Sequence, residues 1–200
     1  VNHLDARLPV QYVIRPQTHK FRDYRGYAGK IEGGAFKKGD RVKLLPSGFK
    51  TTIKAIEING ENIEEAYSPM SVSVTLMDDL DISRGDMIVK ENNVPVISQD
   101  LDLMICWMDS ANLKSRKKVI IKHTTNECMG MITDILYKLD INTLHSIKDS
   151  ETFKLNDIGR IKIRSSKPLF YDSYKKNRHT GSVILIDPNT NATIAAGMII

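Results

Sequence analysis

The sequence has few cysteines, few aromatic side chains and no long apolar run. Its two cysteines, Cys106 and Cys128, lie far apart and form no CxxC pair. Such usage argues against a disulfide framework or a zinc knuckle and is typical of the reducing cytoplasm. No apolar run approaches the roughly 20 residues that span a bilayer, and the polar N-terminal residues do not resemble a signal peptide. We therefore expect a cytoplasmic protein without a membrane partner.

The overall composition is that of a globular chain. Aromatic residues make up 6%, but 41% of the residues are hydrophobic and 26% are charged, which is not the balance of a disordered chain. A length of 200 residues suits one large β domain or two domains of about 100 residues each. The 29 Lys and Arg exceed the 24 Asp and Glu and give a net charge of +5, which is compatible with an acidic protein partner, with RNA or with no particular partner.

Sustained 3.6-residue periodicity is nearly absent, whereas period-two alternation of apolar and polar residues runs along most of the chain. In the first half this pattern predicts strands at 10–14, 27–33, 41–45, 51–58, 71–77 and 87–90. The intervening segments carry the Gly, Pro and Asn of tight reversals, and Asn59-Gly60 favours a type I′ hairpin turn. A single helical turn is conceivable at 62–67. The fold class that this pattern indicates is all-β.

The pattern changes at residues 91–98, a short polar stretch with one proline. Beyond it the predicted strands are longer, at 100–108, 117–123, 129–140, 158–165, 181–187 and 192–200. Two β domains joined near residues 94–98 explain this change better than one continuous fold.

The glycine-rich stretch at 24–48 is a candidate phosphate-binding loop, because glycines followed by Lys-Ser/Thr before a helix can hold an anion. Here Gly33 and Gly34 precede a strand-like segment with no Ser or Thr after the lysines. Residues 23–26 match the D-x-x-G pattern of some GTPases, but no phosphate loop or N-K-x-D motif accompanies them. We interpret the whole stretch as the turns of a barrel.

Other candidate sites are weaker still. His123 and Cys128 lack the second pair of ligands that a structural zinc needs, so a core cysteine and a surface histidine are favoured. The Arg-Gly-Asp tripeptide within 83–86 lies where a strand must reverse, which favours a turn. The basic segment 113–123 has no interleaved aromatic residues for base stacking, and a solvated hairpin edge explains its lysines better.

Several longer stretches resemble one known family. The first half is similar to the second, barrel-forming domain of translation-factor-type GTPases. Within that group, it resembles the large, GTP-binding subunits of bacterial sulfate adenylyltransferases. The second half resembles their third domain, and the run from Asn177 to Met198 is its most specific match. The matching stretches are 7–16, 21–48, 80–88, 105–123, 155–163 and 168–199.

The resemblance implies two consecutive β-barrels and an N-terminal GTPase domain that lies outside this chain. Residues 1–7 are then a linker from that domain, 8–96 a barrel like domain 2 of elongation factor Tu, and 97–200 a barrel like its domain 3. Members of the family pair with a smaller catalytic subunit, as a heterodimer or a larger assembly. The parent complex is a nucleotidyltransferase of sulfate assimilation and cysteine biosynthesis. It converts ATP and sulfate into adenosine 5′-phosphosulfate and pyrophosphate, and GTP hydrolysis drives this step.

No catalytic, cofactor-binding or metal-binding residue is carried over from the family, because its nucleotide motifs lie in the GTPase domain. GTP and magnesium are expected in that domain, and the barrels alone are expected to be non-catalytic and to serve domain and subunit docking. Nucleic acid is not an expected partner. One departure stands at 112–118, where a proline and a glycine are expected before the basic pair near Arg116. The geometry of that turn stays open.

The alternative function is that of a translation-factor GTPase whose barrels bind tRNA, because both groups share this fold. Asn177–Met198 resembles the sulfate-activating subunits more than the elongation factors and favours the first interpretation. A free-standing binding module is a third possibility.

Overall fold

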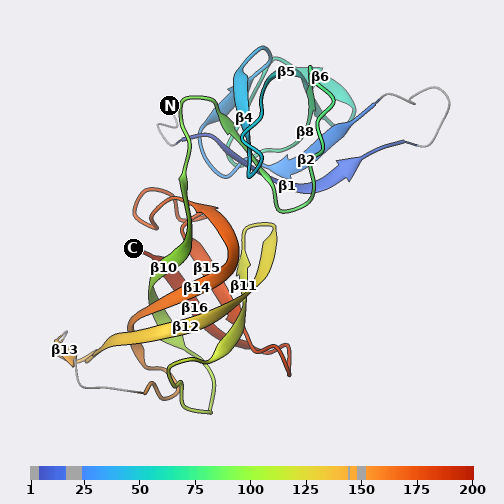
Figure 1. Cartoon of the computed structure of the whole chain (residues 1–200). Helices are drawn as coiled ribbons and strands as arrows, with labels where there is room; N and C mark the ends of the chain where they lie inside the picture. Colours follow the sequence, from blue (N-terminus) through green and yellow to red (C-terminus); the bar gives the residue numbers. More distant parts are fainter. Residues whose placement is uncertain (1–4, 17–23, 144, 148–151) are drawn as a thin grey trace. The chain divides into compact units, whose positions relative to one another are not determined.

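The computed structural model describes residues 5–16, 24–143, 145–147 and 152–200. The chain divides between Pro95 and Val96 into two compact units (Figure 1). Every regular element in the described ranges is a β-strand, which confirms the all-β prediction. None of the described residues forms a helix long and apolar enough to cross a membrane.

The first unit is a closed antiparallel barrel. Its strand order β4-β9-β1-β2-β8-β5 becomes a ring because β4 also pairs with β5. β6 extends the sheet beyond β5, and β3 and β7 form a separate two-stranded ribbon. The strands are β1 (Arg7–Ile14), β2 (Gly26–Lys30), β3 (Ala35–Lys37), β4 (Arg41–Leu45), β5 (Lys50–Ile58), β6 (Glu61–Ile63), β7 (Glu65–Tyr67), β8 (Ser71–Leu76) and β9 (Met87–Lys90).

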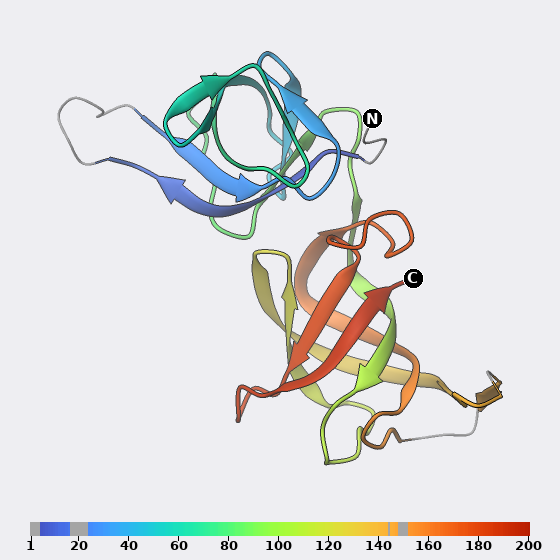
Figure 2. The ribbon, with the colours of Figure 1, turned by 180° about the vertical axis from the view of Figure 1, so that it is seen from behind.

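The second unit repeats this architecture with longer strands. Its order β11-β15-β16-β10-β14-β12 closes through a pairing of β11 with β12, and β13 pairs with the far end of β12. Figure 2 shows β10, β15 and β16 side by side on one side of this barrel. The strands are β10 (Val96–Trp107), β11 (Lys118–His123), β12 (Asn126–Leu139), β13 (Ser146–Ile147), β14 (Ile158–Tyr171), β15 (Ser182–Ile186) and β16 (Thr193–Ile199).

Each barrel has its own apolar core, built from the inward-facing half of the alternation. Leu8, Val10 and Ile56 are fully buried in the first barrel. In the second, the interior holds Ile121 and Trp107, and the Trp107 indole N–H donates a hydrogen bond to the carbonyl of Ala111 at 2.8 Å. Closure fills the interior with side chains and gives each ring strand a paired neighbour on both sides over part of its length.

The turn chemistry follows the sequence closely. Asn59 and Gly60 have φ of 52° and 86°, as a type I′ turn requires, and they join the paired residues Ile58 and Glu61. The turn prediction for 83–86 is also confirmed, because Asp86 Oδ2 accepts the Ser83 amide at 2.8 Å. A helical turn at 62–67 was wrong, since β6 and β7 occupy this segment and pair with other strands.

Candidate functional site

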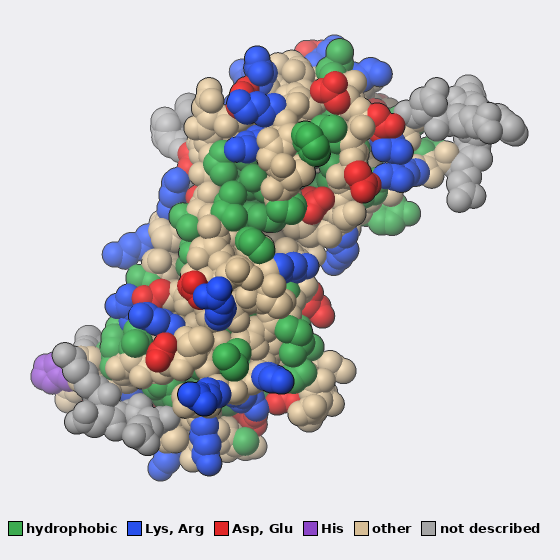
Figure 3. Space-filling view, in the orientation of Figure 1, with side chains coloured by type: hydrophobic (Ala, Val, Ile, Leu, Met, Phe, Trp, Pro, Cys, Tyr) green, Lys and Arg blue, Asp and Glu red, His purple; other side chains and the backbone are tan. Residues whose placement is uncertain are grey.

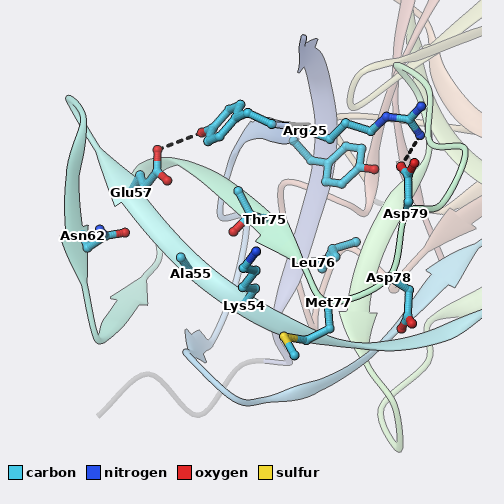
Figure 4. A pocket seen from close by; sticks show the side chains of 12 residues that line it. Arg25, Lys54, Ala55, Glu57, Asn62, Thr75, Leu76, Met77, Asp78 and Asp79 are labelled. Atoms are coloured by element: carbon cyan, nitrogen blue, oxygen red, sulfur yellow. Dashed lines mark hydrogen bonds and ion pairs between the residues drawn. The ribbon is translucent and has the colours of Figure 1, made fainter. Parts of the chain in front are cut away.

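A polar groove of about 640 Å³ lies on the outside of the first barrel (Figure 4). It is formed by β2, β5 and β8 together with the short β6 and the segment that follows β8. Its lining mixes both signs of charge with hydroxyl groups. The lining residues are Tyr24, Arg25, Tyr27, Lys54, Ala55, Glu57, Asn62, Thr75, Leu76, Met77, Asp78 and Asp79.

Hydrogen bonds hold the two ends of this groove. At one end, the Tyr24 hydroxyl donates to Glu57 Oε2 at 2.8 Å. At the other end, Arg25 forms an ion pair with Asp79, and the Tyr27 hydroxyl donates to the carbonyl of Leu80 at 2.9 Å. Burial raises the pKa of Tyr24, and the Glu57 carboxylate raises it further, against the lowering effect of Ser73. The phenol therefore stays protonated at neutral pH and remains a donor.

The floor of the groove offers a free cation. Lys54 projects from β5 between these two ends (Figure 4) and has no ion-pair partner among the described residues. Glu57 and Asn62 lie to one side of it, Asp78 and Asp79 to the other. This arrangement can bind a polar or charged segment of another molecule through hydrogen bonds and charge.

Sequence reasoning did not identify this groove. Its residues come from four separate segments, and no spacing within one segment marks them. The available signal was the outward half of the alternation in β5, which places Lys54 on the outer surface. Only the ring order brings β2 and β8 beside β5.

His123 and Cys128 are both buried, with exposed fractions of 2% and 8%. The core cysteine is confirmed, and burial raises the pKa of its thiol. The expected surface position of His123 was wrong. Its imidazole lies inside the barrel because it continues the inward series Val119 and Ile121 on β11, a signal that the alternation already contained.

A hydrogen-bonded polar network surrounds this histidine. His123 Nε2 lies 2.7 Å from the carbonyl oxygen of Thr180, and the Thr180 hydroxyl donates to Asp172 Oδ2 at 3.0 Å. Asn177 Oδ1 accepts the backbone N–H of Thr180 at 3.3 Å. Burial lowers the pKa of His123, against the raising effects of Thr180 and Asp172. A neutral imidazole that donates Nε2–H to the Thr180 carbonyl fits this environment.

A metal site is not assembled here or elsewhere in the described part of the chain. No three His, Cys, Asp or Glu side chains gather there in a cluster that would hold an ion. The polar groups around His123 form hydrogen bonds with the 172–181 segment and hold that segment in place.

The basic segment 113–123 is not a sheet edge, contrary to expectation. β11 pairs with β12 on one side and with β15 on the other, because the barrel closes at this strand. Lys117 is engaged with Asp187 at 3.0 Å, while Lys114, Arg116 and Lys118 are exposed.

The turn before β11, which departs from the family pattern, has a left-handed backbone at Arg116. Arg116 has φ of 63°, in the left-handed region that favours glycine. Its amide donates to the carbonyl of Ile132 at 2.8 Å, and the Ile132 amide donates to the carbonyl of Lys117 at 3.0 Å. The position near which the family resemblance suggests a glycine therefore keeps a glycine-like backbone while it carries an arginine.

The opening glycine-rich stretch forms turns and strands. Gly34 has φ of 58° and leads into β3, and its carbonyl accepts the amide of Ser68 at 3.0 Å. No helix follows the glycines, so the phosphate cradle is absent from residues 24–48. Of the D-x-x-G stretch, Asp23 lies outside the described residues and Gly26 begins β2.

Curated relatives match the whole chain. The bifunctional enzyme CysN/CysC of Mycobacterium tuberculosis is 48% identical over 200 residues, covering 100% of this chain and 33% of the relative. Sulfate adenylyltransferase subunit 1 of Bacteroides thetaiotaomicron is 42% identical over 207 residues, covering 100% of this chain and 42% of the relative. The chain thus spans well under half the length of these two proteins.

A solved structure shares the fold. The structure of sup35 complexed with GDP matches with a TM-score of 0.85 and 18% sequence identity, over 98% of this chain and 47% of that one. At this identity the likeness concerns the fold alone, and it agrees with barrels of the translation-factor type. The family model described as GTP-eEF1A C-terminal domain-like matches residues 100–200, within the second barrel. Since this match covers half of the sequence, the chain belongs to the GTP-eEF1A C-terminal domain-like family.

Proposed function

We propose that this chain is the two-barrel docking part of the large, GTP-binding subunit of sulfate adenylyltransferase. The observation that carries the proposal is the identity of 42% along the whole chain with a protein named sulfate adenylyltransferase subunit 1. The fold does not discriminate between functions by itself, because sup35 has it at 18% identity. Sequence identity across both barrels does.

In the whole enzyme, ATP and sulfate become adenosine 5′-phosphosulfate and pyrophosphate, and GTP hydrolysis drives this unfavourable step. The adenylyl-transfer site belongs to the smaller subunit in this proposal. GTP and magnesium are bound by a GTPase domain outside the barrels, and the enzyme works in the cytoplasm. The barrels at 8–96 and 97–200 contribute rigid surfaces on which the other domain and the smaller subunit dock.

The physical basis for this role is the closed barrel. A ring of paired strands with a filled interior moves as one body and transmits a displacement without absorbing it. In GTPase switches, hydrolysis releases loops that the γ-phosphate held, and packed domains reorient. In our proposal, residues 8–96 contact the GTPase domain, and both barrels pass its state to the smaller subunit.

The test uses the full-length subunit together with the smaller subunit of the same organism. Deletion of residues 97–200 should abolish the stimulation of adenylyl transfer by GTP, whereas the GTPase domain should still hydrolyse GTP, which serves as the folding control. Normal stimulation after the deletion would refute the transmitting role. If the intact pair forms no adenosine 5′-phosphosulfate, the assignment itself is wrong.

Binding of tRNA is the competing function, and the same preparation tests it. The intact subunit should retain no aminoacyl-tRNA on a filter at concentrations that saturate elongation factor Tu. Retention of tRNA together with an inactive adenylyl transfer would favour the translation-factor alternative.

A further inference from the structure

The outer surface of the second barrel has a charged side and an apolar side. On the charged side, outward-facing residues of β14 pair with β10. Arg160 makes two hydrogen bonds with the Asp102 carboxylate at 2.6 and 2.7 Å, and Arg164 lies 3.0 Å from Asp100. Lys162 is exposed between them. In Figure 3, basic and acidic side chains intermingle over the second barrel in the view where β12 and β14 face the reader. Such charged and ion-paired side chains are typical of a solvent-exposed surface.

Next to these charges, outward-facing positions of the five other ring strands carry apolar residues, where polar residues are usual for a solvated barrel. The two regions meet where Met104 lies opposite Arg160 and Met131 lies opposite Arg164. We call the set of apolar residues the apolar face. Its members are Met104 and Cys106 on β10, Ile120 on β11, Met129 and Met131 on β12, Ile184 and Ile186 on β15, and Ala196 and Met198 on β16.

The pairing register of the strands places these residues opposite one another, so the apolar surface is continuous. Ile120 lies opposite Met129 on one side and opposite Ile186 on the other. Ala196 lies opposite both Ile184 and Cys106. The pair Met104 and Met198 extends the surface by one more row.

Several members of the apolar face are well exposed. The exposed fractions of Met129, Ile184 and Met198 are 43%, 40% and 40%. Single exposed apolar residues are normal, but a contiguous patch across several strands marks an interaction site. The barrel interior does not need these side chains, because Ile105, Ile121 and Val183 already fill it from the same strands.

The charges at this surface indicate the chemistry of the partner. Lys118 and Lys122 flank Ile120 on the outer side of β11, and neither forms an ion pair among the described residues. Glu127 lies opposite Lys122 in the register of β11 and β12. Lys118 has Met131 opposite instead. A partner surface therefore gains most if it carries a carboxylate near Lys118 within an apolar contact.

A groove of about 520 Å³ lies at this edge of the apolar face. Met129 and Met131 line one wall, and Arg164 and Ser166 line another, with Lys118 beside them. The flexible, polarisable methionine side chains adapt to an inserted apolar group. The groove thus accepts an apolar side chain that is flanked by acidic ones.

We propose that the apolar face docks the smaller subunit of the enzyme through an apolar segment that places carboxylates near Lys118 and Lys122. This inference rests on the proposed function, which supplies the partner, and it names the surface that the partner uses. The subunit number in the names of the relatives accords with a second polypeptide.

The decisive variant is Ile184→Asp in the full-length large subunit, mixed with the smaller subunit. The new carboxylate points outward, so the barrel should keep its thermal midpoint. It lies opposite Lys122 in the register, where it would compete with the partner's carboxylates for that lysine, and docking would have to remove its water. We expect the dissociation constant, measured by sedimentation velocity, to rise at least about tenfold. The matched control is Lys162→Asp on the charged side, which should leave the dissociation constant within about twofold.

A footprint gives an independent measurement. Cys106 is partly exposed within the apolar face, while Cys128 is buried. Alkylation of Cys106 by iodoacetamide, followed by peptide mass spectrometry, should slow several-fold when the smaller subunit is present. Cys128 should stay unmodified in both states, which shows that the barrel remains folded.

The outcomes separate this inference from the proposed function. If the intact pair is active and Ile184→Asp binds like wild type with Cys106 unprotected, the apolar face is not the docking surface and the function stands. If Ile184→Asp instead abolishes self-association of the large subunit and leaves the pair intact, a second copy occupies the face and the proposal is wrong. If no pair forms and no product appears, the proposed function fails first.

Discussion

Each barrel is a closed ring of six strands, but the two differ in the surface that they present. The first has a polar groove, in which Tyr24 and Glu57 close one end and Lys54 has no ion-pair partner within the described part of the chain. The second has an apolar face next to exposed lysines and a charged side held by Arg160 and Asp102. In both barrels the inward-facing residues determine the fold. The outward-facing residues of the same strands determine what the barrel can contact. Fold likeness therefore says little about function in this architecture.

The independence of the two barrels can be tested with matched core variants. Ile121→Ala and Ile56→Ala each truncate a fully buried isoleucine, in the second and the first barrel respectively. Each should lower the free energy of unfolding of its own barrel by about 2–5 kcal/mol through the lost burial and the resulting cavity. Trp107 is the single tryptophan and lies in the second barrel. Its fluorescence in a urea titration therefore reports on that barrel.

Only Ile121→Ala should shift the fluorescence midpoint, while circular dichroism should register both variants. An equal fluorescence shift with Ile56→Ala would show that the barrels unfold as one cooperative unit.

A second expected difference is a pH dependence in the second barrel. Burial lowers the pKa of His123 below its ordinary 6.5, so the unfolded chain binds a proton more readily than the folded one. The stability of the barrel should be complete above pH 6.5 and should fall below it, by up to about 1.4 kcal/mol per pH unit.

Urea midpoints followed by Trp107 fluorescence between pH 5 and 8 measure this slope. His123→Gln should flatten it. A slope that survives His123→Gln would assign the effect to another group.

The smallest expected effect concerns the turn before β11. Arg116 has a positive φ, which is unfavourable for a side chain with a Cβ atom. Arg116→Gly should raise the stability of the second barrel by about 0.4–1 kcal/mol, because glycine accepts this conformation without strain. Lys114→Gly, at an exposed position of the same turn that does not have a positive φ, should have the opposite or no effect. Thermal midpoints of the two variants decide the question.

The sequence predicted the elements better than the sites. The strand at 41–45 was placed at its observed bounds, and the turn at Asn59-Gly60 was correct, because both depend on residues adjacent in the chain. The segment 62–67 looked helical because its acidic residues and alanine suit a helix, but pairing of Glu65 with Lys37 across the ribbon decided its conformation. His123 was wrongly predicted at the surface because the prediction relied on its being a histidine. Its position in the alternation of β11 is an inward-facing one.

By itself, the sequence determined that this chain forms strands, where most of them turn, and which side of many strands is apolar. Those properties depend on neighbours one or two residues away. The tertiary structure decided which strands become neighbours and where each ring closes. It gathered Met104, Ile184 and Met129 on one outer surface, and Tyr24 and Asp79 at the two ends of one groove. Strand register joins residues distant in the chain, and no local pattern encodes it.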